Sequence, residues 1–302
     1  MLAKTVRGAA DLLHVSQPGV SQILKHMESR LGIRLFDRLK GRLVPTPEAL
    51  ELFGEIQKIY KYLDNLNYVT QRISRGVDSV LRIGSSPSIG RYFVPHALTE
   101  LRRRMPDLAL HLDIISVDET VDYLLSRKGE NAVTIFPIAH PLIDSQLIAT
   151  GELVCVIPKA HRFAHRARLD VRELRDEVLI SFRPDAYHWQ AISAVCSEAG
   201  LQLNVHTFVR FAETACHLVE SGLGIALVDE FTVMKGSFAR LATVRLKQKY
   251  TFDAHLHRNN TIAASAGGRE LATCLASIAK QTQLACGASV PAAPVAQSLQ
   301  PK

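Results

Sequence analysis

Two short amphipathic segments open the chain, and a break of a few residues separates them. The hydroxyl of Thr5 is placed to cap the first segment, whose apolar residues continue to Leu13. Ser16 is placed to cap the second segment, and a proline follows in the first turn, where a missing backbone N–H costs little. Two short helices joined by a tight turn are typical of a helix-turn-helix.

The second helix has two faces of opposite character. Val20, Leu24, Met27 and Leu31 recur at helical spacing and form one apolar stripe. The other face carries short polar side chains and a lysine, groups that can bond base edges or phosphates in a DNA groove. The candidate DNA-binding residues of this helix are Ser16, Gln17, Pro18, Ser21, Gln22 and Lys25.

Residues 33–45 read as a β-hairpin that would form a wing beside these helices. Gly32 ends the preceding helix, and the two predicted strands turn at Lys40 and Gly41. Arg38, Lys40 and Arg42 recur at every second position around this turn, so they can meet backbone phosphates. A solvated charged hairpin is the alternative, and the neighbouring helix-turn-helix favours the DNA contact.

A single long helix is predicted from Pro47 to about Ser74. Its apolar positions step alternately by three and four residues, as at the a and d positions of a coiled coil. Such a seam needs a partner helix, so we expect self-association, with a core helix of one globular domain as the alternative. The seam consists of Ala49, Leu52, Ile56, Ile59, Leu63, Leu66, Thr70 and Ile73.

From residue 76 onward, short apolar strands alternate with amphipathic helices. This alternation predicts an α/β domain with a mainly parallel sheet. The pattern restarts with a strand at Leu153–Ile157, which predicts two lobes, and ligands of such sheets bind outside the carboxyl ends of strands. The predicted domains are 1–46 for the DNA-binding head, 47–75 for the linker helix and 76–284 for the ligand-binding domain, followed by a disordered tail, 285–302. Lobe one takes about 80–150 plus a C-terminal return, and lobe two takes about 151–250.

Charge is concentrated at one end of the 302 residues. The formal net charge is +7, and residues 1–47 hold eight Lys and Arg against three acids, or 8 − 3 = +5. The other 255 residues carry 28 − 26 = +2. This asymmetry predicts that the N-terminal end binds nucleic acid. We find no membrane-spanning run and no signal peptide, so we expect a cytoplasmic protein without a membrane partner.

Catalysis and metal binding find little support in the sequence. The five cysteines include no Cys-x-x-Cys pair, and no nucleophile elbow, zinc-protease motif or phosphate loop occurs. We therefore expect no enzyme, no metal and no cofactor. Cys196 and Cys216 fit buried small hydrophobes better than a redox switch, and His161 and His165 fit a solvated basic loop better than a metal site.

These residues together resemble the LysR-type transcriptional regulators over about residues 5–283. The resemblance implies a winged helix-turn-helix, a dimerising linker helix and a two-lobed α/β effector domain related to periplasmic binding proteins. It also implies double-stranded promoter DNA, a small-molecule effector, homodimers pairing into tetramers, and RNA polymerase as partners. The motifs that carry it are Leu13-His14-Val15-Ser16-Gln17-Pro18, Leu35-Phe36-Asp37-Arg38, Pro45-Thr46, Leu81-Arg82-Ile83-Gly84, Glu213-Thr214 and Gly222-Leu223-Gly224-Ile225-Ala226.

Residues 40–49 look most like the branch that regulates lysine biosynthesis and opine catabolism, which implies an amino-acid or amino-acid-derived co-inducer. The family's effector contacts map onto Ser86 and Ser88, in the loop after the first strand, whose hydroxyls would suit a ligand carboxylate. Phe136, Ser181 and Arg183 are further candidates for the effector site, and Arg183 could pair with a carboxylate.

Two departures from the family pattern stand out. Members normally begin with another helix before the position of Thr5, so we expect this head to lack one wall of its core. The alternative function is therefore an N-terminally truncated regulator that binds ligand and dimerises but does not bind DNA. Asn131-Ala132-Val133 stands where the family usually has an Asp-Leu-Ala run, a change expected to alter the effector cleft.

Overall fold

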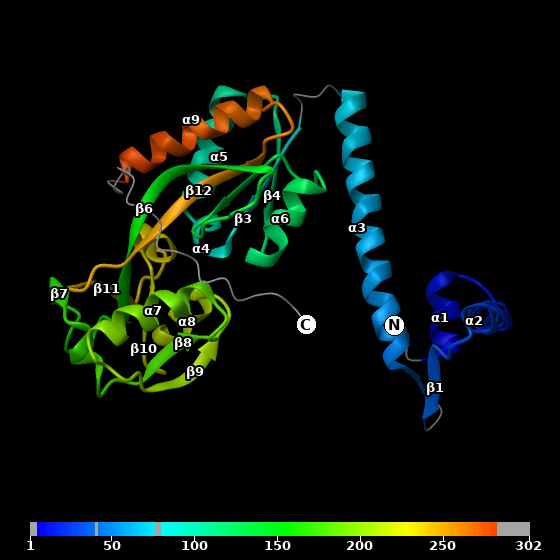
Figure 1. Ribbon diagram of the computed structural model, residues 1–302, viewed down its shortest axis with the longest axis horizontal. Helices are drawn as coiled ribbons and strands as arrows, with labels where there is room; N and C mark the ends of the chain where they lie inside the picture. Colours follow the sequence, from blue (N-terminus) through cyan, green and yellow to red (C-terminus); the bar gives the residue numbers. More distant parts are fainter. Residues whose placement is uncertain (1–4, 40–41, 76–79, 283–302) are drawn as a thin grey trace. The chain divides into compact units, whose positions relative to one another are not determined.

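The computed structural model describes residues 5–39, 42–75 and 80–282, and the chain divides into two units, residues 1–70 and 71–302 (Figure 1). The first unit opens with α1 (Val6–Leu13) and α2 (Gln17–Leu31). Thr5 Oγ1 accepts from the Gly8 N–H at 3.0 Å, and Ser16 Oγ accepts from the Gly19 N–H at 3.3 Å. Both predicted caps and the helix-turn-helix are thereby confirmed.

The wing is a two-stranded antiparallel sheet. Strands β1 (Phe36–Leu39) and β2 (Arg42–Pro45) pair in register, and the predicted turn at Lys40 and Gly41 lies outside the described residues. Glu28 on α2 holds the base of the wing, because its Oε1 accepts from the Leu35 N–H at 2.8 Å and from the Phe36 N–H at 3.3 Å. The Glu28 carboxylate therefore joins α2 to the start of the wing.

Thr46 connects the wing to the long helix α3 (Pro47–Arg75). Its Oγ1 donates to the Arg34 carbonyl at 2.8 Å and accepts from the Ala49 N–H at 3.2 Å, which caps α3. The predicted long helix is confirmed. Along its seam Ala49 is buried, whereas the side chains nearer the middle are exposed to solvent in the single chain; these are Ile59, Leu63 and Leu66.

The second unit contains two lobes whose strands form one continuous ladder in the order β4-β3-β5-β12-β6-β10-β8-β9. In lobe one, three parallel strands lie beside the antiparallel β12, and α5 and α9 pack together (Figure 1). Its elements are β3 (Val80–Ser85), α4 (Pro87–Gly90), α5 (Phe93–Arg104), β4 (Ala109–Ile114), α6 (Val117–Leu125), β5 (Asn131–Thr134), β12 (Thr251–Asn259) and α9 (Ala266–Gln281).

Lobe two repeats this plan with three parallel strands. Gly224 lies just before the strand Ile225–Asp229 and lets it pair closely with the strand Leu179–Phe182. Its φ of 156° is accessible to glycine, and a Cβ there would lie 2.3 Å from the Val178 carbonyl oxygen. Its elements are β7 (Arg168–Leu169), the 3-10 helix η1 (Val171–Leu174), β8 (Leu179–Phe182), α7 (Tyr187–Glu198), β9 (Val205–Val209), α8 (Ala212–Glu220), β10 (Ile225–Asp229), the 3-10 helix η2 (Glu230–Gly236) and β11 (Leu241–Leu246).

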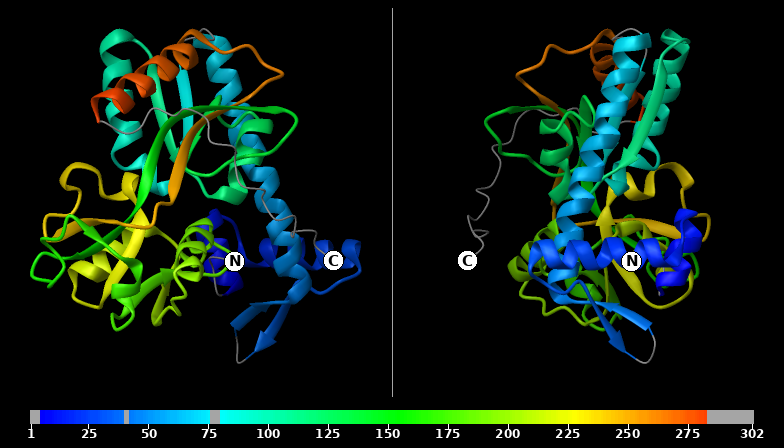
Figure 2. Two further views of the ribbon diagram at one scale, coloured as in Figure 1. Left: turned by 60° about the vertical axis from the view of Figure 1, so that its left-hand side comes forward. Right: turned by 90° about the vertical axis from the view of Figure 1, so that its right-hand side faces the viewer.

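One long strand, β6 (Ile143–Pro158), belongs to both lobes (Figure 2). Its residues 143–152 pair with β12, and its residues 153–158 pair with β10 and β11. The predicted start of a new strand at Leu153 is wrong, because the strand already begins at Ile143. The first half of the strand escapes prediction because polar residues interrupt it and it lacks a continuous apolar run.

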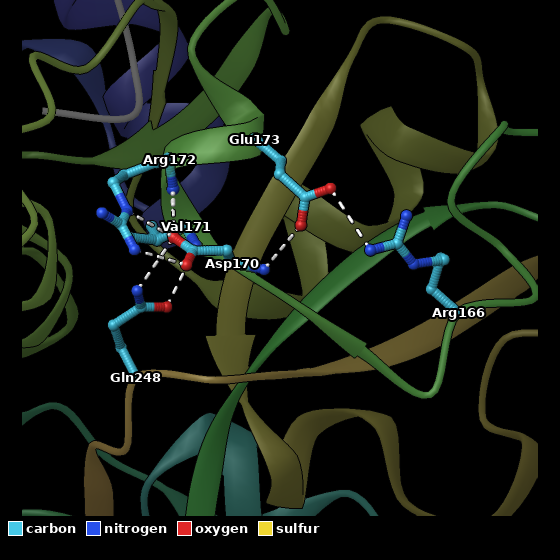
Figure 3. A network of polar contacts seen from close by, with 6 residues as sticks. All are labelled: Arg166, Asp170, Val171, Arg172, Glu173 and Gln248. Carbon is cyan, nitrogen blue, oxygen red and sulfur yellow. Dashed lines mark hydrogen bonds and ion pairs between the residues drawn. The ribbon is translucent and has the colours of Figure 1, made fainter.

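A polar network closes the end of lobe two where β7 meets the segment before β12 (Figure 3). Asp170 caps η1, and Gln248 donates to its Oδ1 at 3.0 Å while accepting from the Val171 N–H at 3.0 Å. The Arg172 guanidinium forms a bidentate pair with Asp170. Hydrogen bonds from Arg172 are the main cause that lowers the pKa of Asp170 below its usual value.

A buried histidine links three strands of lobe one. His257 Nδ1 lies 2.7 Å from Ser145 Oγ, and its Nε2 lies 2.8 Å from Thr134 Oγ1, which donates to the Phe136 carbonyl. Burial lowers the pKa of His257 from 6.5 to about 3, so the imidazole is neutral at physiological pH. The stability it contributes is full above pH 6.5 and is lost as the pH falls toward 3.

His257→Gln should therefore flatten the pH dependence of stability. Between pH 7 and pH 5, protonation of the unfolded histidine removes about 2 kcal/mol from the wild type. Urea unfolding followed by circular dichroism at the two pH values should show this loss in the wild type and in the exposed control His111→Gln. An equal loss in His257→Gln would contradict the assignment.

Candidate functional site

The candidate DNA-binding residues of α2 lie mostly on its solvent-exposed surface. Gln17, Pro18, Gln22 and Lys25 are exposed, and Ser21 is half-buried. The hydroxyl of Ser16 is engaged as the helix cap, so it acts first on the fold. On the wing, Arg38 lies opposite Leu43 and Arg42 lies opposite Leu39; the two arginine side chains, and Lys40 entirely, lie outside the described residues.

Lobe one and lobe two of the second unit contact each other through polar and aromatic side-chain pairs. Arg91, just after α4, forms an ion pair with Glu213 on α8, and its guanidinium lies 5.4 Å from the centre of the Phe238 ring. The Phe93 and Phe231 rings meet edge to face at 6.0 Å, which is favourable for aromatic pairs. Helix α4 packs against α8 and η2 of lobe two, and Phe93 at the start of α5 adds to this contact.

Asp229, the last residue of β10, is a fully buried carboxylate at this contact. Its Oδ2 lies 2.7 Å from His188 Nε2, and Thr232 donates to it through both its N–H and its hydroxyl. Desolvation opposes the charge of Asp229, but hydrogen bonds from His188, Thr232 and Ser88 outweigh it and hold the pKa below its usual value. Because Ser88 belongs to α4, this carboxylate joins the two lobes.

Two other serines of the second unit, Ser86 and Ser181, have buried hydroxyls with no hydrogen-bond partner. Ser86 follows the carboxyl end of β3 and is 3% exposed, and Ser181 lies in the carboxyl half of β8 and is fully buried. Buried hydroxyls normally find a partner, so an unpaired one calls for an explanation. Both stand where ligands of parallel sheets bind, one in each lobe.

Of the remaining predicted effector residues, Phe136 is buried at the contact between the lobes, whereas Arg183 is exposed and already has an acidic partner. Phe136 is buried two residues beyond β5, and its ring meets that of Tyr187 in lobe two edge to face at 6.2 Å. Burial, with Tyr250 and Asp253 nearby, raises the pKa of Tyr187. Arg183 is exposed, and its guanidinium is held by both carboxylate oxygens of Asp185 at 2.9 and 3.1 Å. A ligand carboxylate would have to displace Asp185 to reach it.

Sequence reasoning missed Asp229, His188 and Tyr187. His188 and Asp229 are 41 residues apart, so only the fold brings them together. The signal that could have found Asp229 is an acid at the end of an otherwise apolar strand, Ile225–Asp229, since a charge that ends a buried strand needs a partner.

The described cysteines are buried thiols, and His161 has an acidic partner. Cys155, Cys196, Cys216 and Cys274 are buried and free, and burial raises the pKa of Cys216 to about 12, so its thiol stays protonated. His161 is paired with Glu177 at 3.3 Å. Among the described residues, no group of three metal-ligating side chains occurs, and no helix is long and apolar enough to cross a membrane.

Two family models match the chain. One, described as LysR substrate binding domain, matches residues 74–277, and another, described as bacterial regulatory helix-turn-helix protein of the lysR family, matches residues 2–50. The second match favours DNA binding over the alternative of a regulator that binds only its ligand.

Individual relatives agree with the family models. The HTH-type transcriptional regulator DgcR of Pseudoalteromonas sp is 30% identical over 275 residues, which cover 90% of this chain and 94% of the relative. Full-length BenM has a similar fold, with a TM-score of 0.60, 21% identity and 96% of each chain covered. The effector binding domain of QuiR in complex with shikimate has a TM-score of 0.57 at 16% identity, covering 67% of this chain and 97% of that domain.

Asp229→Asn should destabilise lobe two, because it removes the charge that His188 and Thr232 stabilise. We expect a loss of about 3 kcal/mol in the free energy of unfolding. Urea unfolding followed by fluorescence of Trp189, the single tryptophan, reports this lobe. The control Asp185→Asn removes an exposed partner and should cost less than about 1 kcal/mol. Equal losses in the two variants would refute the role of Asp229.

Proposed function

Because the chain belongs to the LysR family of DNA-binding transcriptional regulators, we propose that it controls bacterial promoters in response to an amino-acid-like molecule bound between its two lobes. The observation that carries the proposal is the pair of buried, unpaired hydroxyls of Ser86 and Ser181. Each lobe contributes one of them at a strand end, so a ligand with oxygen or amine groups could satisfy both.

The lobe contacts supply a reason why such a ligand would change the protein. Ser88 and Asp229 already join α4 to β10, and the ring of Phe136 touches that of Tyr187. A ligand that bridges Ser86 and Ser181 would favour one arrangement of the lobes by its differential affinity. The resemblance of residues 40–49 to regulators of amino-acid and opine metabolism supports an amino-acid-like chemistry for this ligand.

At the other end of the chain, Gln17, Ser21, Gln22 and Lys25 would read base edges in the major groove, while Arg38, Lys40 and Arg42 would bind phosphates. The exposed apolar seam around Ile59, Leu63 and Leu66 supports a dimer through α3. We further propose that two such dimers pair into a tetramer on promoter DNA. The protein would act in the cytoplasm, where the tetramer could contact RNA polymerase.

Gln22→Ala and Arg42→Ala should affect DNA binding in different ways. On a site selected from random-sequence DNA, loss of the Gln22 amide should reduce the preference over a scrambled site about tenfold. Loss of Arg42 should weaken both sites alike and lower the slope of log affinity against log salt by about 1. Fluorescence anisotropy measures both, with exposed Gln190→Ala as control. Undiminished preference in Gln22→Ala would exclude Gln22 as a reading residue.

An amino acid or opine that binds between the lobes should raise the melting temperature of the full chain. At one hundred times its dissociation constant, the expected rise is roughly 5 °C. The double variant Ser86→Ala, Ser181→Ala should lose this rise, whereas Ser193→Ala, whose exposed hydroxyl bonds the Gln190 carbonyl, should keep it. A rise that survives in the double variant would place the ligand elsewhere.

A further inference from the structure

Lobe one contains a cavity of about 370 Å³ on the side of its sheet that α9 covers. Residues of three neighbouring strands form its floor, and α9 with the residue before its cap forms its roof. The lining residues that matter here are Asn131, Asp144, Leu256, Arg258, Gly268 and Arg269.

The floor carries a polar row that the strand register sets. Asn131 on β5 lies opposite Arg258 on β12, and Arg258 lies opposite Asp144 on β6, so the three side chains share one face. Arg258 Nη2 and Asp144 Oδ2 are 3.4 Å apart, and both side chains are about half exposed. Arg269 adds a second positive charge from α9, so two arginines face one aspartate around the cavity.

One member of the row lacks a partner. Asn131 is 2% exposed, and its Nδ2 has no hydrogen-bond partner. An unpaired buried donor is costly unless a ligand or water satisfies it. The neighbouring Glu130 is not a partner of Asn131 Nδ2. Its Oε1 instead accepts from the Ser265 N–H at 2.8 Å, where α9 begins.

The absence of a side chain at Gly268 lets the first turn of α9 approach Glu130 and Asn131 closely. A Cβ there would lie 3.1 Å from Asn131 Nδ2 and 2.2 Å from Glu130 Oε1. The Asn131 amide lines the cavity near the N-terminus of the 16-residue α9, where the Glu130 carboxylate also lies and bonds the Ser265 N–H. The apolar part of the lining consists of Leu256, Ala264 and Ala272, and Ser145 and Gln146 add further polar groups.

We propose that this cavity is a second small-molecule site, separate from the region between the lobes, and that it binds a small monocarboxylic acid with a short apolar body. The carboxylate accepts from Asn131 Nδ2 and is neutralised by Arg258 and Arg269. The apolar body lies against Leu256 and the two alanines. An amine of the same shape would face two like charges and a donor with nothing to accept it.

Hexanoate and hexylamine test this charge preference, because they match in length and differ in sign. Isothermal titration calorimetry on the full chain should give saturable binding of hexanoate at millimolar concentration and none of hexylamine. Asn131→Asp, which keeps the shape and replaces the donor by an anion, should weaken hexanoate binding about tenfold or more. Arg258→Gln with Arg269→Gln should do the same if the first variant folds poorly.

Two control variants locate hexanoate binding in this cavity. Arg103→Gln removes an exposed arginine of the same lobe and should leave hexanoate binding unchanged. Ser86→Ala with Ser181→Ala should also leave it unchanged, so the outcome does not depend on the proposed effector site. The proposal is overturned if hexylamine binds equally well, if hexanoate fails to bind, or if the cavity variants bind it as the wild type does.

Discussion

The pairing of β6 with both halves of the ladder is the constraint on which the effector unit depends. A single strand of 16 residues bonds to β12 in lobe one and to β10 and β11 in lobe two. Since hydrogen bonds fix the register of each pair, the strand sets where the carboxyl ends of both parallel sheets lie. The loop after β3 and the end of β8 can then contribute groups to one ligand.

The groups at these strand ends are more polar than a packed interior requires. Asp229 carries a charge without solvent exposure, and it is satisfied by partners from both lobes. Burial of such a group favours the one arrangement that satisfies it, because loss of a partner leaves the charge less well compensated in a low-dielectric interior. The unpaired hydroxyls of Ser86 and Ser181 are the opposite case, an arrangement that a further molecule can complete.

Local interactions were the part of this protein that the sequence predicted well. The caps by Thr5 and Ser16 connect residues three apart, so the residue type and its position sufficed. Interactions between residues far apart in the chain could not be predicted from the sequence. Thr134 and His257 are 123 residues apart, and the first half of β6 is a strand because β12 pairs with it. Propensity carries no information about such partners.

For the site residues too, the sequence indicates the residue type, whereas the fold determines the contacts and the location. Ser86, Ser88 and Ser181 could be identified from a family pattern, but their different states, two unpaired and one bonded to Asp229, follow from packing between lobes. Asn131 was expected to alter the effector cleft, which stays a prediction; the register of β5 and β12 places it opposite Arg258, and it lines a cavity together with residues of α9. Its residue type was informative, and its location depended on the sheet.

A ligand bound between the lobes should change their relative arrangement about β6. Spin labels at Arg103→Cys on lobe one and Arg162→Cys on lobe two, both exposed, report the distance between lobes in a Cys286→Ser background. With a stabilising amino acid or opine at saturation, pulsed electron resonance should give a shorter and narrower distance distribution. An unchanged distribution at a concentration that saturates binding would show that the ligand does not rearrange the lobes.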